Sequence, residues 1–270
     1  MTPDPFSGWL AALETRHLAN LRVAEVTRAL RALSSAYVQR RHRIAAGAPL
    51  DSAGKRAAFA LYYGPLHYLA TRHVLAGLNA GAPPAFILDL GCGTGAAGAA
   101  WATTGGRAGA ILGLDRHPWA ADEARWTYRF FGLDGGARVG DLTRVPPLTP
   151  GSGVVAAYVL NELPAPQRAA LETTLLNAGT SGVRVLVLEP VSRKVAPWWD
   201  ATASRVSAAG GRADEWRFHV DLPPLVRLFD RAAGLRHEEL TVRSLSMNVG
   251  SEKEPGRVER PGSGKPSSSN

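Results

Sequence analysis

The chain has 270 residues, of which 45% are hydrophobic and 20% are charged, a balance typical of one globular α/β domain with an extension. No uninterrupted apolar run approaches the ~18 residues of a membrane-spanning helix, and the first residues lack the basic and apolar regions of a signal peptide. We therefore expect a cytoplasmic protein. The single cysteine, Cys92, excludes an intrachain disulfide and a cysteine-clustered metal site, and we predict no metal.

The charge balance is basic, with 31 Lys and Arg against 23 Asp and Glu. Much of the excess precedes the main domain, where few acids oppose it. Such a cluster can bind the phosphates of RNA through counterion release, and it can equally be the solvated face of a helix. RNA as a partner of the N-terminal region is thus one of two interpretations. The basic residues concerned are Arg16, Arg22, Arg28, Arg31, Arg40, Arg41, Arg43, Lys55 and Arg56.

The N-terminal region has the periodicity of helices. Between residues 9 and 44 apolar side chains recur mostly every three or four positions, which predicts one or two amphipathic helices. Residues 56–78 form a second helical segment, which we expect Gly64 and Pro65 to interrupt. Residues 1–80 are therefore interpreted as a helical N-terminal extension.

From residue 81 the pattern changes to short apolar runs that alternate with helix-like stretches. The runs are FILDL, GAILGLD, ARVGD, GVVAAYVL and VRVLVLE. Such runs are typical of strands buried on both faces, and hence of a parallel sheet between two helical layers. A further helix and one or two strands, one of them antiparallel, should complete the domain. The predicted fold class is α/β: a Rossmann-like, doubly wound, mostly parallel sheet over residues 81–248, followed by a disordered tail, 249–270.

The strongest local signal is the stretch FILDLGCGTGAAGAAW. A strand ends near Asp89, a turn carries Gly91, Gly93 and Gly95, and a helix of small residues follows. Glycine is needed where the backbone turns sharply and lets a ligand approach, and the start of the helix offers free N–H groups. The stretch predicts a crevice for a nucleotide-type cofactor. The glycine pattern alone also fits a nicotinamide cofactor.

The surrounding residues resemble the class I S-adenosylmethionine-dependent methyltransferase family over about residues 84–190. The resemblance implies that Asp89 orients the methionine moiety of the cofactor. It implies that Asp115, after the second strand, accepts hydrogen bonds from the ribose hydroxyls, a task that suits a carboxylate. It also implies that Asp141 meets the adenine amino group and that Leu142 or Trp119 packs on the adenine ring.

Each acid also has a simpler explanation, because an Asp after a strand is often a helix cap or a turn residue. Their joint spacing from the glycine turn favours the methyltransferase. Cys92 is included among the cofactor-binding residues as a small residue that fills a tight space between glycines. A nicotinamide dehydrogenase would need a residue pair such as Tyr-x-x-x-Lys, and no lysine follows a tyrosine at that spacing.

The turn after the fourth strand, AAYVLNELP, should face the transferred methyl group. Asn161 can donate and accept hydrogen bonds, and Glu162 can take a proton from the acceptor, so we predict both as catalytic. A helix-entry cap before Pro164 is the alternative. With Glu189-Pro190, VLNELP also resembles, more weakly, the ribosomal small-subunit-associated (Rsm-type) methyltransferase-like family, whose cysteine cluster this chain lacks. That resemblance implies ribosomal RNA as the acceptor.

Several aromatic and histidine side chains are further candidates for the acceptor site. Tyr62, Tyr63, His67 and His73 can line its mouth, and His219 can act as a base, although core packing or a structural hydrogen bond explains each of them too. The sequence thus predicts a methyltransferase with an unidentified acceptor. A non-catalytic protein of this fold in RNA binding or ribosome assembly, and a small-molecule methyltransferase, are the alternatives.

Overall fold

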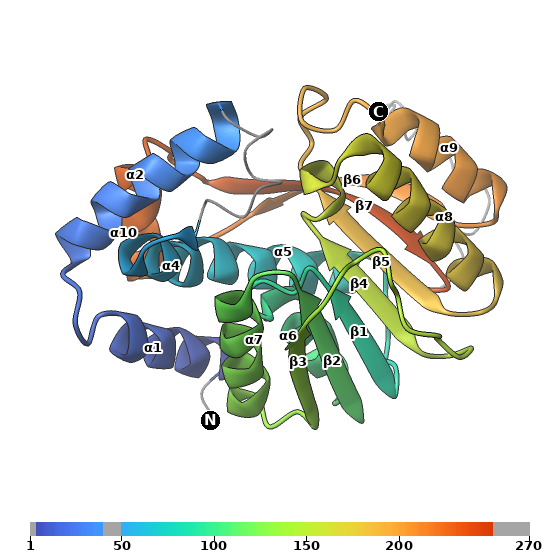
Figure 1. Cartoon of the computed structure of the whole chain (residues 1–270), viewed down its shortest axis with the longest axis horizontal. Helices are drawn as coiled ribbons and strands as arrows, with labels where there is room; N and C mark the ends of the chain where they lie inside the picture. The colour runs from blue at the N-terminus through green and yellow to red at the C-terminus, as the bar shows by residue number, and fades with distance from the viewer. Residues whose placement is uncertain (1–3, 40–49, 251–270) are drawn as a thin grey trace, which may run out of the picture.

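The computed structural model describes residues 4–39 and 50–250. Its centre is a seven-stranded sheet in the order β3-β2-β1-β4-β5-β7-β6 (Figure 1). The first five strands run parallel, and β7 is antiparallel to both of its neighbours. The predicted fold class is confirmed. The strands are β1 (Phe86–Leu90), β2 (Ala110–Asp115), β3 (Gly135–Val139), β4 (Gly153–Ala157), β5 (Arg184–Glu189), β6 (Arg212–His219) and β7 (Glu239–Met247).

Helices cover both faces of the sheet because successive strand residues point to opposite sides. One face packs on α8 (Ala165–Thr180) and α9 (Trp199–Ala208), with Leu88 of β1 in that core. The other packs on α6 (Ala96–Thr103), α7 (Pro118–Phe130) and α10 (Pro224–Ala232), with Ile87 in its core. Every helix in residues 4–39 and 50–250 is too short or too polar to cross a membrane.

The N-terminal helices join the second of these cores. They are α1 (Pro5–His17), α2 (Val23–Gln39), α4 (Ala53–Ala58), the π-helical segment η2 (Phe59–Tyr63) and α5 (Gly64–Gly77). Trp9 and Leu30 are fully buried in one cluster with Ile87 and Phe229. The division that we predicted at residue 80 falls between α5 and β1, but the hydrophobic core continues across it. The end of the first predicted helix, residues 40–44, and the tail residues 251–270 lie outside the described part.

The predicted interruption at Gly64 and Pro65 is wrong, since the chain stays helical from Ala53 to Gly77. Proline disrupts an α-helix because it lacks the N–H that bonds four residues back. Here the hydrogen bonding shifts to the π pattern, with the Gly64 N–H donating to the Phe59 carbonyl oxygen. Pro65 then occupies the first turn of α5, where it needs no such donor.

Two strands end earlier than the sequence predicted. The run ARVGD leaves the sheet at Val139, so Asp141 lies in the following turn. The run GVVAAYVL leaves it at Ala157. Tyr158 then adopts a positive φ of 62°, and a short 3-10 helix, η3 (Leu160–Glu162), follows. Both corrections place predicted site residues on turns at the carboxyl edge of the sheet.

The buried carboxylate of Glu123 on α7 binds two side chains of α1. The Glu123 side chain is 1% exposed and accepts from Arg16 Nε at 3.2 Å, and its Oε1 lies 2.8 Å from His17 Nε2. A buried carboxylate needs such partners because leaving water is costly.

Replacing Glu123 by Ala is expected to lower the free energy of unfolding by about 2 kcal/mol. Removal of one partner of a buried pair costs about 3–5 kcal/mol, less here because Arg16 is partly exposed. Asp122→Ala is the matched control: its exposed pair with Arg125 should contribute less than about 0.5 kcal/mol. Urea unfolding of both variants measures the difference, and equal losses would contradict the role of Glu123.

Candidate active site

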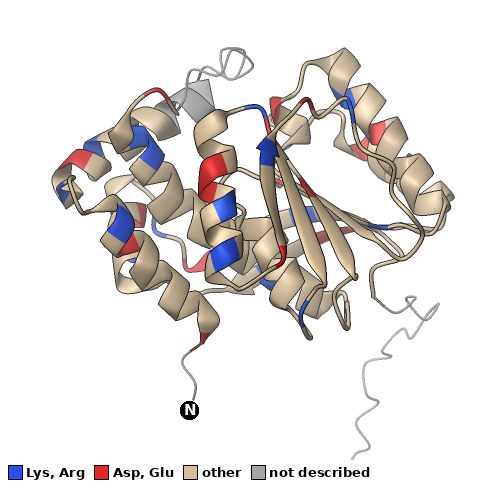
Figure 2. Ribbon diagram, turned by 60° about the horizontal axis from the view of Figure 1, so that its bottom comes forward, with Lys and Arg blue, Asp and Glu red and all other residues tan. Residues whose placement is uncertain are grey.

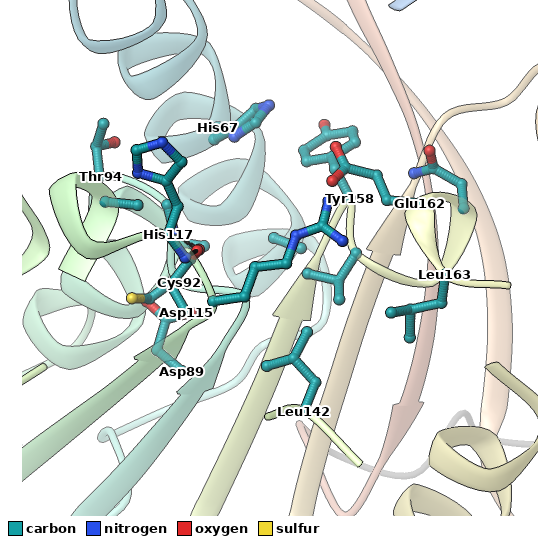
Figure 3. A pocket seen from close by; sticks show the side chains of 18 of the residues that line it. His67, Asp89, Cys92, Thr94, Asp115, His117, Leu142, Tyr158, Glu162 and Leu163 are labelled. Atoms are coloured by element: carbon teal, nitrogen blue, oxygen red, sulfur yellow. Dashed lines mark hydrogen bonds between the residues drawn. The ribbon is translucent and has the colours of Figure 1, made fainter. Parts of the chain in front are cut away.

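A cavity of about 780 Å³ opens at the carboxyl ends of β1 to β4, within the usual size range of small-molecule sites. The neighbours of β1 are β2 on one side and β4 on the other, so the cavity lies at the topological switch point, where doubly wound sheets bind ligands. Of the residues predicted to bind the cofactor or to act in catalysis, Gly95 and Trp119 do not line it, and the others do. Figure 3 shows Asp89, Cys92 and Asp115 at one end, and Tyr158, Glu162 and Leu163 at the other.

The glycine turn has the backbone that the sequence predicted. Gly91, Gly93 and Gly95 all have positive φ, a conformation that other residues adopt only at a cost. A Cβ on Gly91 would lie 2.5 Å from Val159 Cγ2, so the turn also approaches the β4 loop closely. Gly95 does not reach the cavity: it caps α6, and a Cβ there would lie 3.0 Å from the Ala124 Cα. Its role is close packing.

Asp89 lies beneath this turn and is 1% exposed. Its Oδ2 accepts from the Gly98 N–H at 3.0 Å and from the Tyr128 hydroxyl at 2.8 Å. Burial raises the pKa of its carboxyl to about 7, against the effect of these two bonds. Asp89 thus links β1 to α6 and α7, a contact that sequence reasoning missed.

Asp115 is the last residue of β2, and its side chain contacts the glycine turn. Its Oδ2 accepts from the Gly93 N–H at 2.9 Å, and its Oδ1 accepts from the His117 N–H at 2.8 Å. Burial raises the pKa of this carboxyl. Each carboxylate oxygen has two lone pairs, so both oxygens keep a site for a ligand hydroxyl.

The cavity continues to the turn after β3. The exposed Asp141 accepts from the Thr143 N–H at 2.9 Å, and this backbone bond lowers the pKa of its carboxyl. Leu142 is 8% exposed and lines the wall. Val139, which sequence reasoning missed, presents an apolar side chain that is 53% exposed. Trp119 is not among the lining residues; its ring lies 6.4 Å from that of Phe59.

At the other end, Asn161 and Glu162 come from η3. Asn161 Nδ2 donates to Glu189 Oε2 at 2.5 Å, so the last residue of β5 holds the predicted catalytic amide. Glu189 is fully buried, which raises the pKa of its carboxyl to about 8. The signal for this partner was the acid at the end of an apolar run, as for Asp89.

Aromatic rings form the wall between the two ends. His67 of α5 stacks on Tyr158 with ring centres 4.2 Å apart, and Phe59 and Tyr63 of η2 lie beside His67. All four line the cavity. Tyr158 carries a positive φ, which is strained for a bulky residue and is typical of functional sites. Its importance was not evident from the sequence.

The other candidates for the mouth of the site lie elsewhere. Tyr62 is buried, and its hydroxyl donates to Asp230 at 2.7 Å. His73 stacks on Phe218 at 4.5 Å, and His219 is an exposed residue of β6. None of these three residues is part of the cavity wall, because their helix and strand faces point away from it.

The burial of His67 predicts a pH effect on stability. Burial lowers the pKa of its imidazole to about 4, whereas a histidine of the unfolded chain has a pKa near 6.5. Between these values the unfolded state binds a proton that the folded state does not, so stability is lost as the pH falls. Compared with His67→Gln, the wild type should lose about 2–3 kcal/mol of unfolding free energy between pH 7 and pH 4. Urea unfolding of both proteins across this pH range measures the loss. A difference in unfolding free energy that does not change with pH would refute the prediction.

Several known proteins are similar to this chain in sequence or in fold. Residues 87–177 match a family model described as a methyltransferase domain. An assigned O-methyltransferase from Nostoc punctiforme PCC 73102 is 15% identical, with a TM-score of 0.50 over 81% of this chain and 72% of that one. Magnesium protoporphyrin IX methyltransferase from Synechocystis PCC 6803, with bound S-adenosylhomocysteine, is 16% identical, with a TM-score of 0.44 over 78% and 93%. No curated protein matches the sequence.

The matched segment, residues 87–177, contains the glycine turn, the acid that ends β2 and the turn after β4. These features meet in one cavity at the switch point of the sheet. The first structure above has the same fold as this chain. Residues 87–177 of this chain are therefore similar to a methyltransferase domain, and the chain has the Rossmann-like fold of the first structure.

Proposed function

We propose that the protein transfers the methyl group of S-adenosylmethionine to a small acceptor bound beside Asn161. The observation that carries the proposal is the cavity itself, which joins the glycine turn and Asp115 at one end to Asn161 and Glu162 at the other. A donor site and an acceptor site must share one cavity for methyl transfer, because the reacting atoms have to approach within about 3–3.5 Å.

The residues at the first end fit the cofactor. Gly91 and Gly93 add no side chain of their own to the cradle, and a Cβ on Gly93 would lie 3.3 Å from the Phe59 ring. Asp115 keeps lone pairs for two ribose hydroxyls, since each oxygen accepts one backbone N–H. Val139 and Leu142 offer apolar surface to adenine. When bound, the cofactor supplies an activated methyl group with its own leaving group, so the protein has to bind, orient and exclude water.

Asp141 and Asp89 have different proposed roles. Asp141 is exposed at the cavity wall and keeps acceptor capacity for the adenine amino group. Asp89 acts through the turn: its bonds to Gly98 and Tyr128 fix the start of α6, and any contact with the methionine moiety is additional. Cys92 is buried and packs against Gly113, so it shapes the turn and does not react.

At the acceptor end, Asn161 and Glu162 are the proposed positioning and proton-accepting groups. The cavity has the volume of one drug-sized ligand, which supports a small acceptor over a ribosomal RNA. Several N-terminal basic residues also have partners within the chain: Arg16 with Glu123, Arg31 Nε with the Ala232 carbonyl, Lys55 with Asp51 and Arg56 Nε with the Leu50 carbonyl. Figure 2 shows basic and acidic residues interspersed over this region. Arg40, Arg41 and Arg43 lie outside the described residues.

Thermal unfolding with S-adenosylhomocysteine, with NADH as the control, tests the cofactor. Ligand at about a hundred times its dissociation constant should raise the midpoint by roughly 5–10 °C. Transfer of labelled methyl from S-adenosylmethionine is then measured with a small-metabolite extract and with ribosomal RNA.

Turnover of the extract supports a small acceptor, and turnover of the RNA supports the ribosomal alternative. Asn161→Ala should bind S-adenosylhomocysteine normally and lose transfer. Binding without transfer to either preparation would favour a non-catalytic protein of this fold and refute the proposal.

A further inference from the structure

The carboxylate of Glu189 makes all of its recorded hydrogen bonds to one short segment, η3. Its Oε1 accepts from the Leu160 N–H at 2.8 Å and from the Asn161 N–H at 3.3 Å, and its Oε2 accepts from Asn161 Nδ2 at 2.5 Å. The residue is 0% exposed. Burying a carboxylate costs several kcal/mol unless hydrogen bonds replace its water, so this arrangement fixes the position of η3 and the orientation of one side chain.

That side chain is the amide of Asn161, which has a donor end and an acceptor end. An ionised carboxylate can only accept hydrogen bonds, so Glu189 holds the Nδ2 end. Asn161 lines the cavity, whereas Glu189 does not. With Nδ2 bonded to Glu189, the end of the amide that is left for a ligand in the cavity is its carbonyl oxygen, Oδ1.

We propose that Glu189 is a positioning residue, which turns Asn161 Oδ1 towards the cavity to accept a hydrogen bond from the N–H or O–H of the methyl acceptor. The inference rests on the proposed methyl transfer and narrows its acceptor class. The acceptor is a neutral molecule whose reacting nitrogen or oxygen carries a hydrogen. Carboxylates, thioethers and tertiary amines do not meet this requirement.

Methyl transfer to such an acceptor does not require a strong base. An amide oxygen is too weak a base to remove the proton. Asn161 therefore orients the acceptor so that the lone pair of the acceptor atom is directed at the methyl carbon. The new bond to carbon forms as the carbon–sulfur bond breaks, and the electron pair of that bond stays on sulfur. The positive charge passes to the acceptor atom, which then releases its proton to Glu162, the proposed proton acceptor at this end of the cavity.

The charged and titratable groups around Glu189 make this orientation depend on pH. Tyr158 follows β4, Glu162 belongs to η3, and Arg243 of β7 is the strand neighbour of Glu189. Arg243 directs its guanidinium to Glu215 at 3.3 Å. Burial first, with a contribution from Glu162, raises the pKa of Glu189 to about 8. Below that pH a protonated Oε2 would donate and the amide would present Nδ2 to the cavity, so the proposed orientation belongs to the ionised form of Glu189, which predominates above about pH 8.

Nuclear magnetic resonance of the full chain, without ligand, tests the orientation. We would follow the side-chain amide of Asn161 from pH 6.5 to 9.5 in the wild type and in Glu189→Gln, with Asn161→Ala to assign the signal. The control is Glu172→Gln, a second buried carboxylate, which pairs with Arg205. The amide shift of Asn161 should change with pH in the wild type and in Glu172→Gln, and this change should be lost in Glu189→Gln.

Identical Asn161 shifts in the wild type and in Glu189→Gln would overturn the proposal. This readout needs neither cofactor nor turnover, so it can fail while methyl transfer itself stands. The acceptor class is tested with S-adenosylhomocysteine and two matched probes, aniline and N,N-dimethylaniline. Aniline should shift the Asn161 amide signal and dimethylaniline should not. An equal response to both probes, or a response to neither, would refute recognition of the donor hydrogen.

Discussion

Replacing Asp115 by Asn is expected to weaken the binding of S-adenosylhomocysteine by about 10- to 100-fold. Hydrogen bonds to a charged group contribute about 1.5–3 kcal/mol each, and we propose that this carboxylate accepts from two ribose hydroxyls. The substitution also turns an –NH₂ group towards the N–H of Gly93 or of His117, which now donate to Asp115. Two donors then face each other, and the glycine turn loses one of its supports.

Isothermal titration calorimetry measures the affinity, and thermal unfolding without ligand shows whether the variant is folded. Asp141→Asn is the matched control, because its side-chain oxygen can still accept from the Thr143 N–H in an exposed turn. We expect that control to weaken binding by less than about fivefold, as for a single exposed hydrogen bond. Equal losses in the two variants would contradict the special role of Asp115.

Replacing Gly91 by Ala is expected to lower the free energy of unfolding by about 3 kcal/mol and to abolish binding of S-adenosylhomocysteine. Its φ is +61°, and the new Cβ would lie 2.5 Å from Val159 Cγ2. The turn has to move to relieve this contact, and movement displaces the N–H groups that would face the cofactor.

Gly81→Ala separates the cost of the left-handed backbone from the cost of the close contact with Val159. Gly81 has a similar φ of +65°, but a Cβ there meets nothing within 4 Å, so this control should lose only the ~1 kcal/mol of the left-handed backbone. In Gly91→Ala with Val159→Ala the clashing methyl groups are gone, and part of the stability should return. Urea unfolding and calorimetry measure these effects. Equal losses in the two glycine variants would show that the close approach to Val159 is unimportant.

The sequence by itself determined most of the elements and the residues that meet at one end of the cavity. Buried strands are visible as Val, Ile and Leu runs, and a glycine turn or an acid at a strand end is a local feature. Asp89, Gly91 and Asp115 could therefore be placed from their neighbours in the chain. Their positions at the carboxyl edge follow from the parallel direction of the strands.

Only the tertiary structure decided the contacts that connect these elements. Asp89 bonds to Tyr128, 39 residues away, and Asn161 to Glu189, 28 residues away. Such pairs depend on how helices and strands pack, and each residue type has many other uses. The same reason explains why Gly95 was predicted as a ligand although it packs on α7, since a glycine pattern does not tell which side of a turn faces the cavity.

The N-terminal helices show the same contrast between what the local sequence determines and what packing determines. Their periodicity predicted apolar faces, but not that η2 and α5 would bring Phe59, Tyr63 and His67 over the cavity. It also did not predict that Pro65 would be accommodated by a π segment, because that change of hydrogen bonding is stabilised by burial of Leu61 and Tyr62 in the common core. Local sequence determines which residues form an element, and packing over long distances in the chain determines what that element faces.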